Sequence, residues 1–165
     1  MKKLLKVNLS SILILGLFAF MPEIYGQQKE IEMRALTESS DLIVVGKVLK
    51  TKAEWGVDKK RIYTNVTILV DEFVKGSQGN NYIIVSHPGG EIGEVGELYS
   101  DVPSFSKDEE LILFIKKDNN SNLIINGGNS GKVSVNKDKL ISGKMTVDDK
   151  PIDSVVSKIK KMLQK

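Results

Sequence analysis

The sequence predicts an all-β fold with flanking helices, in which a small antiparallel barrel follows a short N-terminal helix and precedes a C-terminal amphipathic helix. Several segments rich in β-branched residues alternate apolar and polar side chains and follow one another at short spacings. One of them, at 42–55, is long and carries Gly46 near its middle. Closure removes exposed sheet edges, so a closed or nearly closed barrel is expected.

The first 26 residues have the layout of a secretory signal peptide. A basic end with three lysines precedes an apolar run, which stops at Pro22 and is followed by the small residue Gly26. The apolar run is shorter than the ~20 residues that a membrane span needs. Cleavage after Gly26, to within several residues, leaves a mature chain 27–165 that is expected to fold as one domain, secreted or periplasmic, without an integral membrane segment.

The mature chain is nearly neutral and has no cysteine. The full chain has a formal net charge of +3, the signal segment accounts for +2, and the remainder is about +1. One tryptophan and no basic stripe between aromatic residues argue against nucleic-acid binding. The lack of cysteine excludes disulfides, thiolate metal ligands, a cysteine nucleophile and a lipoprotein anchor. The 139 residues left when 26 are removed from 165 can form an apolar core without cross-links.

The mature chain starts with a helical pattern and then changes to strands. Residues 30–41 mix apolar and charged side chains and predict a short helix that ends near Ser39 or Ser40. Residues 42–55 and 61–76 predict two strands, and the second of them alternates clearly. Its buried face is expected to consist of Ile62, Thr64, Val66, Ile68 and Val70.

Four further segments are expected to form strands. Residues 81–88 predict a third strand, which Pro88 ends because proline cannot donate to a ladder. The near-continuous apolar run at 109–117 predicts a strand that is buried on both faces. Residues 122–127 and 131–136 predict a hairpin pair with "NGGNSG" as its turn, since Asn-Gly tolerates the positive φ of tight hairpins.

The strand at 42–55 is expected to bend at Gly46. If it were straight, it would span ~45 Å at ~3.3 Å per residue, which exceeds the height of a small barrel. The strand must therefore coil and serve two sheets, and a glycine or a β-bulge lets it turn the corner between them. Val44 and Val48 are expected to face the core on either side of the bend. The core side chains expected nearby are Ile68, Ile84, Leu113 and Ile115.

The segment 151–164 predicts an amphipathic helix with Pro151 at its first helical position. The apolar residues that recur with helical spacing are Ile152, Val155, Val156, Ile159, Met162 and Leu163. We expect this face to dock on the barrel. Because the outer face is basic, a helix at a membrane surface is the alternative.

The stretch "SHPGGEIGEVG" at 86–96 predicts a mobile loop that leaves the third strand. It holds the only histidine and four glycines, which permit positive φ. Loops on a rigid scaffold are where binding usually resides, so 86–106 is the first candidate binding segment. Its candidate residues are His87, Pro88, Gly89, Gly90, Glu91, Glu94, Asp101 and Phe105. Trp55 and Tyr63, at neighbouring strand ends, are secondary candidates.

No metal site, cofactor or catalytic set is predicted. A zinc site needs several nitrogen or sulfur ligands, and His87 with Glu91 and Glu94 supplies one nitrogen donor. His87, Asp101 and Ser130 follow the chain order of chymotrypsin-like proteases, but a triad is recognised by its geometry. The chain is also too short for two barrels.

Particular stretches resemble a recurring type of exported bacterial protein and the netrin-like barrels of tissue inhibitors of metalloproteinases. They are "SSDLIVVGKV", Trp55, "IYTNVTILVDEFVKG", "HPGGEIG", "DVPSFSKDEELILFI" and "INGGNSGKVSV", between residues 39 and 135. The resemblance implies a barrel of the oligonucleotide/oligosaccharide-binding (OB) type with flanking helices. It also implies an exported metalloprotease as a partner. The animal inhibitors approach the zinc of their target through an N-terminal cysteine, and this chain has none, so that mechanism does not carry over.

The expected function is therefore that of a secreted, non-enzymatic binding module, either protease-inhibitor-like or protease-associated. Two alternatives remain open. One is a small secreted hydrolase that uses His87, and the other is a structural protein of the cell envelope that is held by its basic C-terminal helix.

Overall fold

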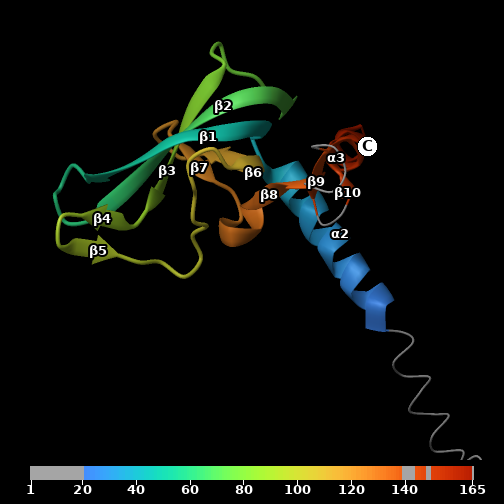
Figure 1. Ribbon diagram of the computed structural model, residues 1–165, viewed down its shortest axis with the longest axis horizontal. Coiled ribbons are helices and arrows are strands. Elements are labelled where there is room, and N and C mark those ends of the chain that lie inside the picture. Colours follow the sequence, from blue (N-terminus) through green and yellow to red (C-terminus); the bar gives the residue numbers. More distant parts are fainter. Residues whose placement is uncertain (1–20, 139–143, 148–149, 165) are drawn as a thin grey trace, which may run out of the picture. The chain divides into compact units, whose positions relative to one another are not determined.

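The computed structural model describes residues 21–138, 144–147 and 150–164 (Figure 1). The chain divides into two compact units, Met1–Ala35 and Leu36–Lys165, and each is considered by itself. Helix α2 (Met21–Ser39) begins in the first unit and ends in the second. The predicted helix at 30–41 is confirmed and ends where expected, although it starts earlier. The predicted signal segment up to residue 20 lies outside the described residues.

The second unit is mostly β-sheet and ends in a helix, as the sequence predicted. Helix α3 spans Ile152–Leu163, and a short 3₁₀ turn, η1, spans Gly128–Gly131. In the described part of the chain, no helix combines the length and the apolar character needed to cross a membrane. The strands are β1 (Leu42–Trp55), β2 (Ile62–Lys75), β3 (Tyr82–Pro88), β4 (Gly90–Ile92), β5 (Val95–Glu97), β6 (Glu110–Lys117), β7 (Leu123–Ile125), β8 (Lys132–Asp138), β9 (Lys144–Val147) and β10 (Lys150–Pro151).

Strand β1 pairs along one edge with β2 and along the other with β6. The pairings continue from β2 to β3, from β3 to β7 and from β7 to β6, so the series returns to β1. The link between β3 and β7 is parallel and consists of one residue pair, Ser86 with Ile124. A register shift between Val45 and Gly46 interrupts the pairing of β1 with β2. The long strand is thus irregular at the predicted position. The prediction that it serves two sheets is wrong, because its two neighbours, β2 and β6, belong to the same sheet.

Strands β7 and β8 do not form the predicted hairpin. Both pair with β6, β7 near its end at Ile115–Lys117 and β8 near its start at Glu110–Leu113. The chain between them turns through η1, where Gly127 and Gly128 have φ of 79° and 56°. The "NGGNSG" segment therefore carries the chain along the β6 edge from one strand to the next. Both segments pair with the long apolar strand β6. This pairing between residues distant in sequence overrides the preference of "NGGNSG" for a hairpin turn.

The core lies on one face of β1, β2, β3 and β6. Val44, Val48, Ile68, Leu113 and Ile115 are completely buried in it, as predicted. Ile84 is not in this core, because its side chain is largely exposed. The core residues of β3 are Ile83 and Val85 instead. Adjacent isoleucines in "YIIVSHP" leave the alternation ambiguous, and the register with β2 decides which one points inward.

Helix α3 packs its apolar face inward, as predicted. The buried residues are Ile152, Val155, Val156, Ile159 and Met162. Lys160 on α3 forms a 2.6 Å ion pair with Glu72 on β2, and the Thr37 hydroxyl donates to the Met162 sulfur over 3.9 Å. Pro151 caps the helix rather than occupying its first turn, because it also pairs with Thr146 of β9.

Candidate functional site

The segment after β3 is a hairpin rather than the irregular loop that the glycines predicted. Strands β4 and β5 form a two-stranded sheet of their own, with Glu91 opposite Gly96 and Ile92 opposite Val95. Gly93, with φ of 63°, makes the turn between them. The available sequence signal was the two-residue turn Gly93-Glu94 between Ile92 and Val95, and the other glycines obscured it.

Two hydrogen bonds to the backbone of Gly89 fix the start of this hairpin against β2. The Gly89 N–H donates to the Ile62 carbonyl over 2.8 Å, and the Thr64 hydroxyl donates to the Gly89 carbonyl over 2.7 Å. Gly90 has φ of 135°, and a Cβ placed there would lie 2.4 Å from the Thr64 hydroxyl oxygen. Glycine is required at this position both for its backbone conformation and for the close approach of the two segments.

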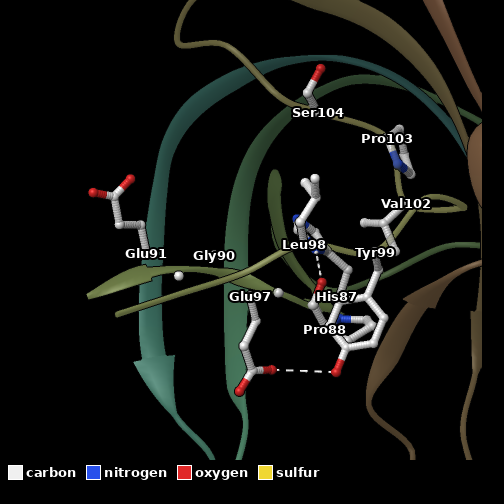
Figure 2. Close-up of a pocket in the computed structure, with 12 residues that line it drawn as sticks. His87, Pro88, Gly90, Glu91, Glu97, Leu98, Tyr99, Val102, Pro103 and Ser104 are labelled. Atoms are coloured by element: carbon white, nitrogen blue, oxygen red, sulfur yellow. Dashed lines mark hydrogen bonds between the residues drawn. The ribbon is translucent and has the colours of Figure 1, made fainter. Parts of the chain in front are cut away.

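A largely apolar hollow of about 420 Å³ lies between the hairpin and the segment that follows it (Figure 2). The residues that line it are His87, Pro88, Gly89, Gly90, Glu91, Gly96, Glu97, Leu98, Tyr99, Val102, Pro103 and Ser104. Leu98 is 98% exposed, and the partly exposed side chains of Tyr99 and Val102 line the same hollow. Such a patch of exposed apolar groups beside a groove is typical of a surface that contacts a partner.

Tyr99 positions the segment that carries Leu98. Its hydroxyl accepts a 2.9 Å hydrogen bond from the Arg61 guanidinium and donates to the Glu97 carboxylate over 3.3 Å. The hydrogen bond to Tyr99 raises the pKa of the Arg61 guanidinium above its ordinary value, so this side chain remains charged. These contacts connect the turn between β1 and β2 to the hairpin region and hold the wall of the hollow.

His87 lies at the back of the hollow, where its ring stacks on that of Phe105. The ring centroids are 5.7 Å apart and the planes differ by 23°. The ammonium of Lys132 lies 5.0 Å from the centroid of the Phe105 ring. Phe105 also packs against the hydrophobic core. The segment 101–106 is thereby held against the core.

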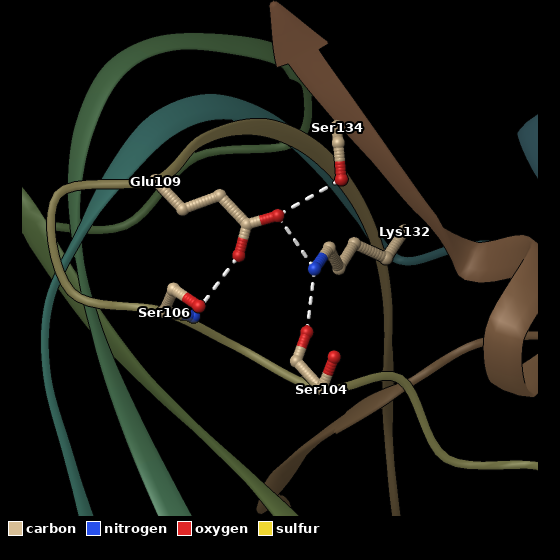
Figure 3. A network of polar contacts seen from close by, with 5 residues as sticks. All are labelled: Ser104, Ser106, Glu109, Lys132 and Ser134. Atoms are coloured by element: carbon tan, nitrogen blue, oxygen red, sulfur yellow. Dashed lines mark hydrogen bonds and ion pairs between the residues drawn. The ribbon is translucent and has the colours of Figure 1, made fainter.

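A network of polar contacts also anchors the same segment (Figure 3). The Lys132 ammonium pairs with a Glu109 carboxylate oxygen at 2.6 Å and also donates to the Ser104 carbonyl. The Glu109 carboxylate accepts further bonds from the Ser134 hydroxyl at 2.8 Å and the Ser106 N–H at 3.1 Å. Burial raises the pKa of Glu109, but the bonds from Lys132, Ser106 and Ser134 outweigh it and hold this pKa below its ordinary value.

The lowered pKa of Glu109 predicts a loss of stability on acidification. Its contribution to the free energy of unfolding is fully present above the unfolded-state pKa of 4.5 and is lost as the pH falls through the lower folded-state pKa. We expect wild type to be more stable than Glu109→Gln at about pH 7 and the difference to shrink at about pH 3. Urea unfolding of both proteins measures this, and a difference independent of pH would contradict the assignment.

The structure distributes the predicted site residues among several places. Glu94 lies at the exposed turn of the hairpin, and Asp101 lies against Gly128. Trp55 ends β1 opposite Ile62 and does not line this hollow, whereas Tyr63 lines a second hollow that Trp55 does not line either. The residues of the hollow that the sequence did not single out are Gly96, Glu97, Leu98, Tyr99, Val102, Pro103 and Ser104. Leu98 and Tyr99 lie between Gly96 and Pro103, so an apolar pair in a turn-rich segment was the signal available.

His87 and Asp101 do not have the geometry of a catalytic triad. A triad needs the histidine Nδ1 bonded to the aspartate carboxylate, whereas here Nδ1 lies 2.8 Å from the Pro88 carbonyl. The Asp101 carboxylate instead accepts a 3.4 Å bond from the Asn129 N–H. Within the described residues, no group of three or more His, Cys, Asp or Glu side chains is arranged to hold a metal ion.

The chain matches no protein-family model and no curated protein.

Proposed function

We propose that this chain is a secreted, non-enzymatic binding module with an OB-like barrel. The series of pairings from β1 through β2, β3, β7 and β6 back to β1 supports the barrel, since each of these strands has a neighbour on both edges. The single parallel pair between β3 and β7 is compatible with the partly open barrel that is typical of this fold.

The single observation that carries the binding role is the exposed Leu98 on the rim of an apolar hollow. The hollow is built on buried structure, because Phe105 packs on the core and Glu109 holds the segment through its bond from the Ser106 N–H. A protruding apolar group on a fixed frame costs little ordering entropy when it is buried by a partner. Central, well-packed apolar anchors account for most of the affinity at protein interfaces.

The partner that we propose is an exported protein, and an exported metalloprotease is the first candidate. The resemblance to tissue inhibitors of metalloproteinases motivates this choice. Because the chain has no cysteine, contact through Leu98 and the hollow beside it is expected to occupy the protease surface rather than to chelate its metal ion.

The test compares capture of exported proteins by the purified mature chain and by two variants. Leu98→Asp is expected to abolish capture with little change in stability, because a charge at the centre of an apolar contact is buried without a counter-charge. Leu49→Asp is the matched control, since Leu49 is also an exposed leucine but lines neither this hollow nor the second one.

Capture that is lost in Leu98→Asp and retained in Leu49→Asp supports the proposed surface. Equal capture by both variants would show that Leu98 is not an anchor. A captured metalloprotease is then assayed with increasing amounts of the chain, and activity that does not fall would rule out inhibition as the role.

A further inference from the structure

Strand β3 has an edge that is only partly occupied. Its antiparallel pairing with β2 is continuous from Tyr82 to Pro88. On the other edge, pairing with β7 is confined to Ser86 and Ile124. Among the described residues, no strand pairs with this edge at Tyr82 or Ile84.

The hydrogen bonds at the two ends of β3 show which residues face this edge. Asn81 accepts from the Val70 N–H at 2.7 Å, and the Gly89 N–H donates to Ile62 at 2.8 Å. Odd-numbered residues of β3 therefore direct their N–H and C=O groups toward β2, because these directions alternate along an antiparallel ladder. The even-numbered residues Tyr82 and Ile84 direct theirs toward the open edge.

The side chains of the same two residues are also exposed. Tyr82 is 57% and Ile84 is 56% accessible, and both stand on the face opposite the core. Unpaired backbone groups and exposed apolar side chains thus coincide on one short strand. Such an edge is a template for another extended segment.

Ile84 lines a second hollow, of about 910 Å³, on this outer face. It extends from the turn between β1 and β2, which includes Asp58, to the turn between β6 and β7, which includes Asp118. Among the described residues that line it, these two are the only acidic ones, and none is lysine or arginine. Hydrogen bonds led by the one from Asn122 lower the pKa of Asp118, so this carboxylate is ionised at neutral pH. Lys59 and Lys60 in the first turn and Lys117 beside the second are exposed and do not line the hollow. The two carboxylates are therefore the charges inside it, and they favour a basic side chain there.

We propose that the open edge of β3 at Tyr82 and Ile84 binds a basic, extended peptide segment of another protein by strand addition. The backbone groups of these two residues supply the hydrogen bonds, and the two carboxylates attract lysine or arginine side chains of the added strand. A second copy of this chain fits less well, because its β3, "YIIVSHP", carries no lysine or arginine. The site does not include Leu98 and does not depend on the proposed function. An experiment can therefore refute the β3 edge as a binding site without refuting the Leu98 surface, and the reverse.

The first test is amide hydrogen exchange of the folded chain measured by NMR. In the free protein, the Ile84 amide is expected to exchange much faster than those of Ile83 and Val85, which face β2. The probe is a blocked hexapeptide that alternates lysine and valine. Adding it is expected to slow exchange at Ile84, whereas the same peptide with glutamate in place of lysine is expected to have no effect.

The second test uses variants that separate the backbone from the side chain. Ile84→Pro removes an N–H that faces the open edge and leaves the ladder with β2 intact, so the protein is expected to fold. The affinity of Ile84→Pro for the lysine peptide is expected to fall by about tenfold or more, because one hydrogen bond and the apolar contact of the Ile84 side chain are lost. Ile84→Ala keeps the N–H and is expected to lose less. N-methylation of the lysine peptide on one set of alternate residues is expected to abolish binding by wild type.

Three results would overturn the proposal. The first is slow exchange at Ile84 in the free protein that depends on protein concentration, which would assign the edge to a second copy. The second is equal binding of the lysine and glutamate peptides. The third is binding that survives N-methylation of each of the two sets of alternate residues when they are tested separately.

Discussion

Gly46→Val is expected to destabilise the protein by about 3 kcal/mol or more, which is well above the ~1 kcal/mol of a typical point mutation. A Cβ at this position would lie 2.3 Å from the Leu69 carbonyl oxygen and 3.0 Å from the Ile68 Cγ2. The first of these atoms belongs to the backbone of β2, so the strands themselves must separate. Urea unfolding monitored by circular dichroism measures the loss.

Gly79→Val is the matched control for that substitution. Gly79 lies between β2 and β3, and a Cβ there would have no atom within 4 Å. Its effect is expected to stay within about 0.5 kcal/mol, as for most surface substitutions. If Gly46→Val unfolded at the same urea concentration as Gly79→Val, the close approach of β1 to β2 at Gly46 would be refuted.

Lys132→Met is expected to reduce the free energy of unfolding by about 2–4 kcal/mol. The reason is that the Glu109 carboxylate, which is mostly buried, loses the cation that it pairs with. The two side chains are only 10% and 18% accessible. The substitution also removes the donor to the Ser104 carbonyl and the cation beside Phe105. Binding by the Leu98 surface is therefore expected to weaken as well, because the segment that lines the hollow loses its anchor.

Lys47→Met provides the comparison with a solvent-exposed ion pair. Lys47 pairs with Asp108 at 3.1 Å, and these side chains are 37% and 64% accessible. Exposed pairs contribute about 0–1 kcal/mol, so this variant is expected to unfold close to wild type. Similar losses in Lys132→Met and Lys47→Met would mean that the buried network does not hold the segment.

The sequence predicted the strands whose pattern is strong over many residues. Strands β1 and β2 and the buried run of β6 were expected almost to the residue, because β-branched residues and alternation extend over eight or more positions. The buried face of α3 was expected for the same reason. Strands β9 and β10 have four and two residues, and such short segments carry no periodic signal.

The segment that lines the hollow could be located from the sequence, but the arrangement of its residues could not. Pro88 and the glycines after it indicated where β3 ends. They did not indicate that His87 would stack on Phe105, that Asp101 would lie against Gly128, or that Leu98 would remain exposed. Each of these depends on a neighbour more than ten positions away or on the lack of one, which local propensity does not encode.

By itself, the sequence determined the mostly β class, the main strands, the irregularity at Gly46 and the buried face of the last helix, because these follow from side-chain period and backbone sterics within one segment. The tertiary structure decided that β7 and β8 share the edge of β6, and that Ile83 rather than Ile84 enters the core. It also decided that the edge of β3 stays open at Tyr82 and Ile84. The physical reason is that strand pairing is a choice among partners distant in sequence, set by which register buries the most apolar surface and pairs the most backbone groups.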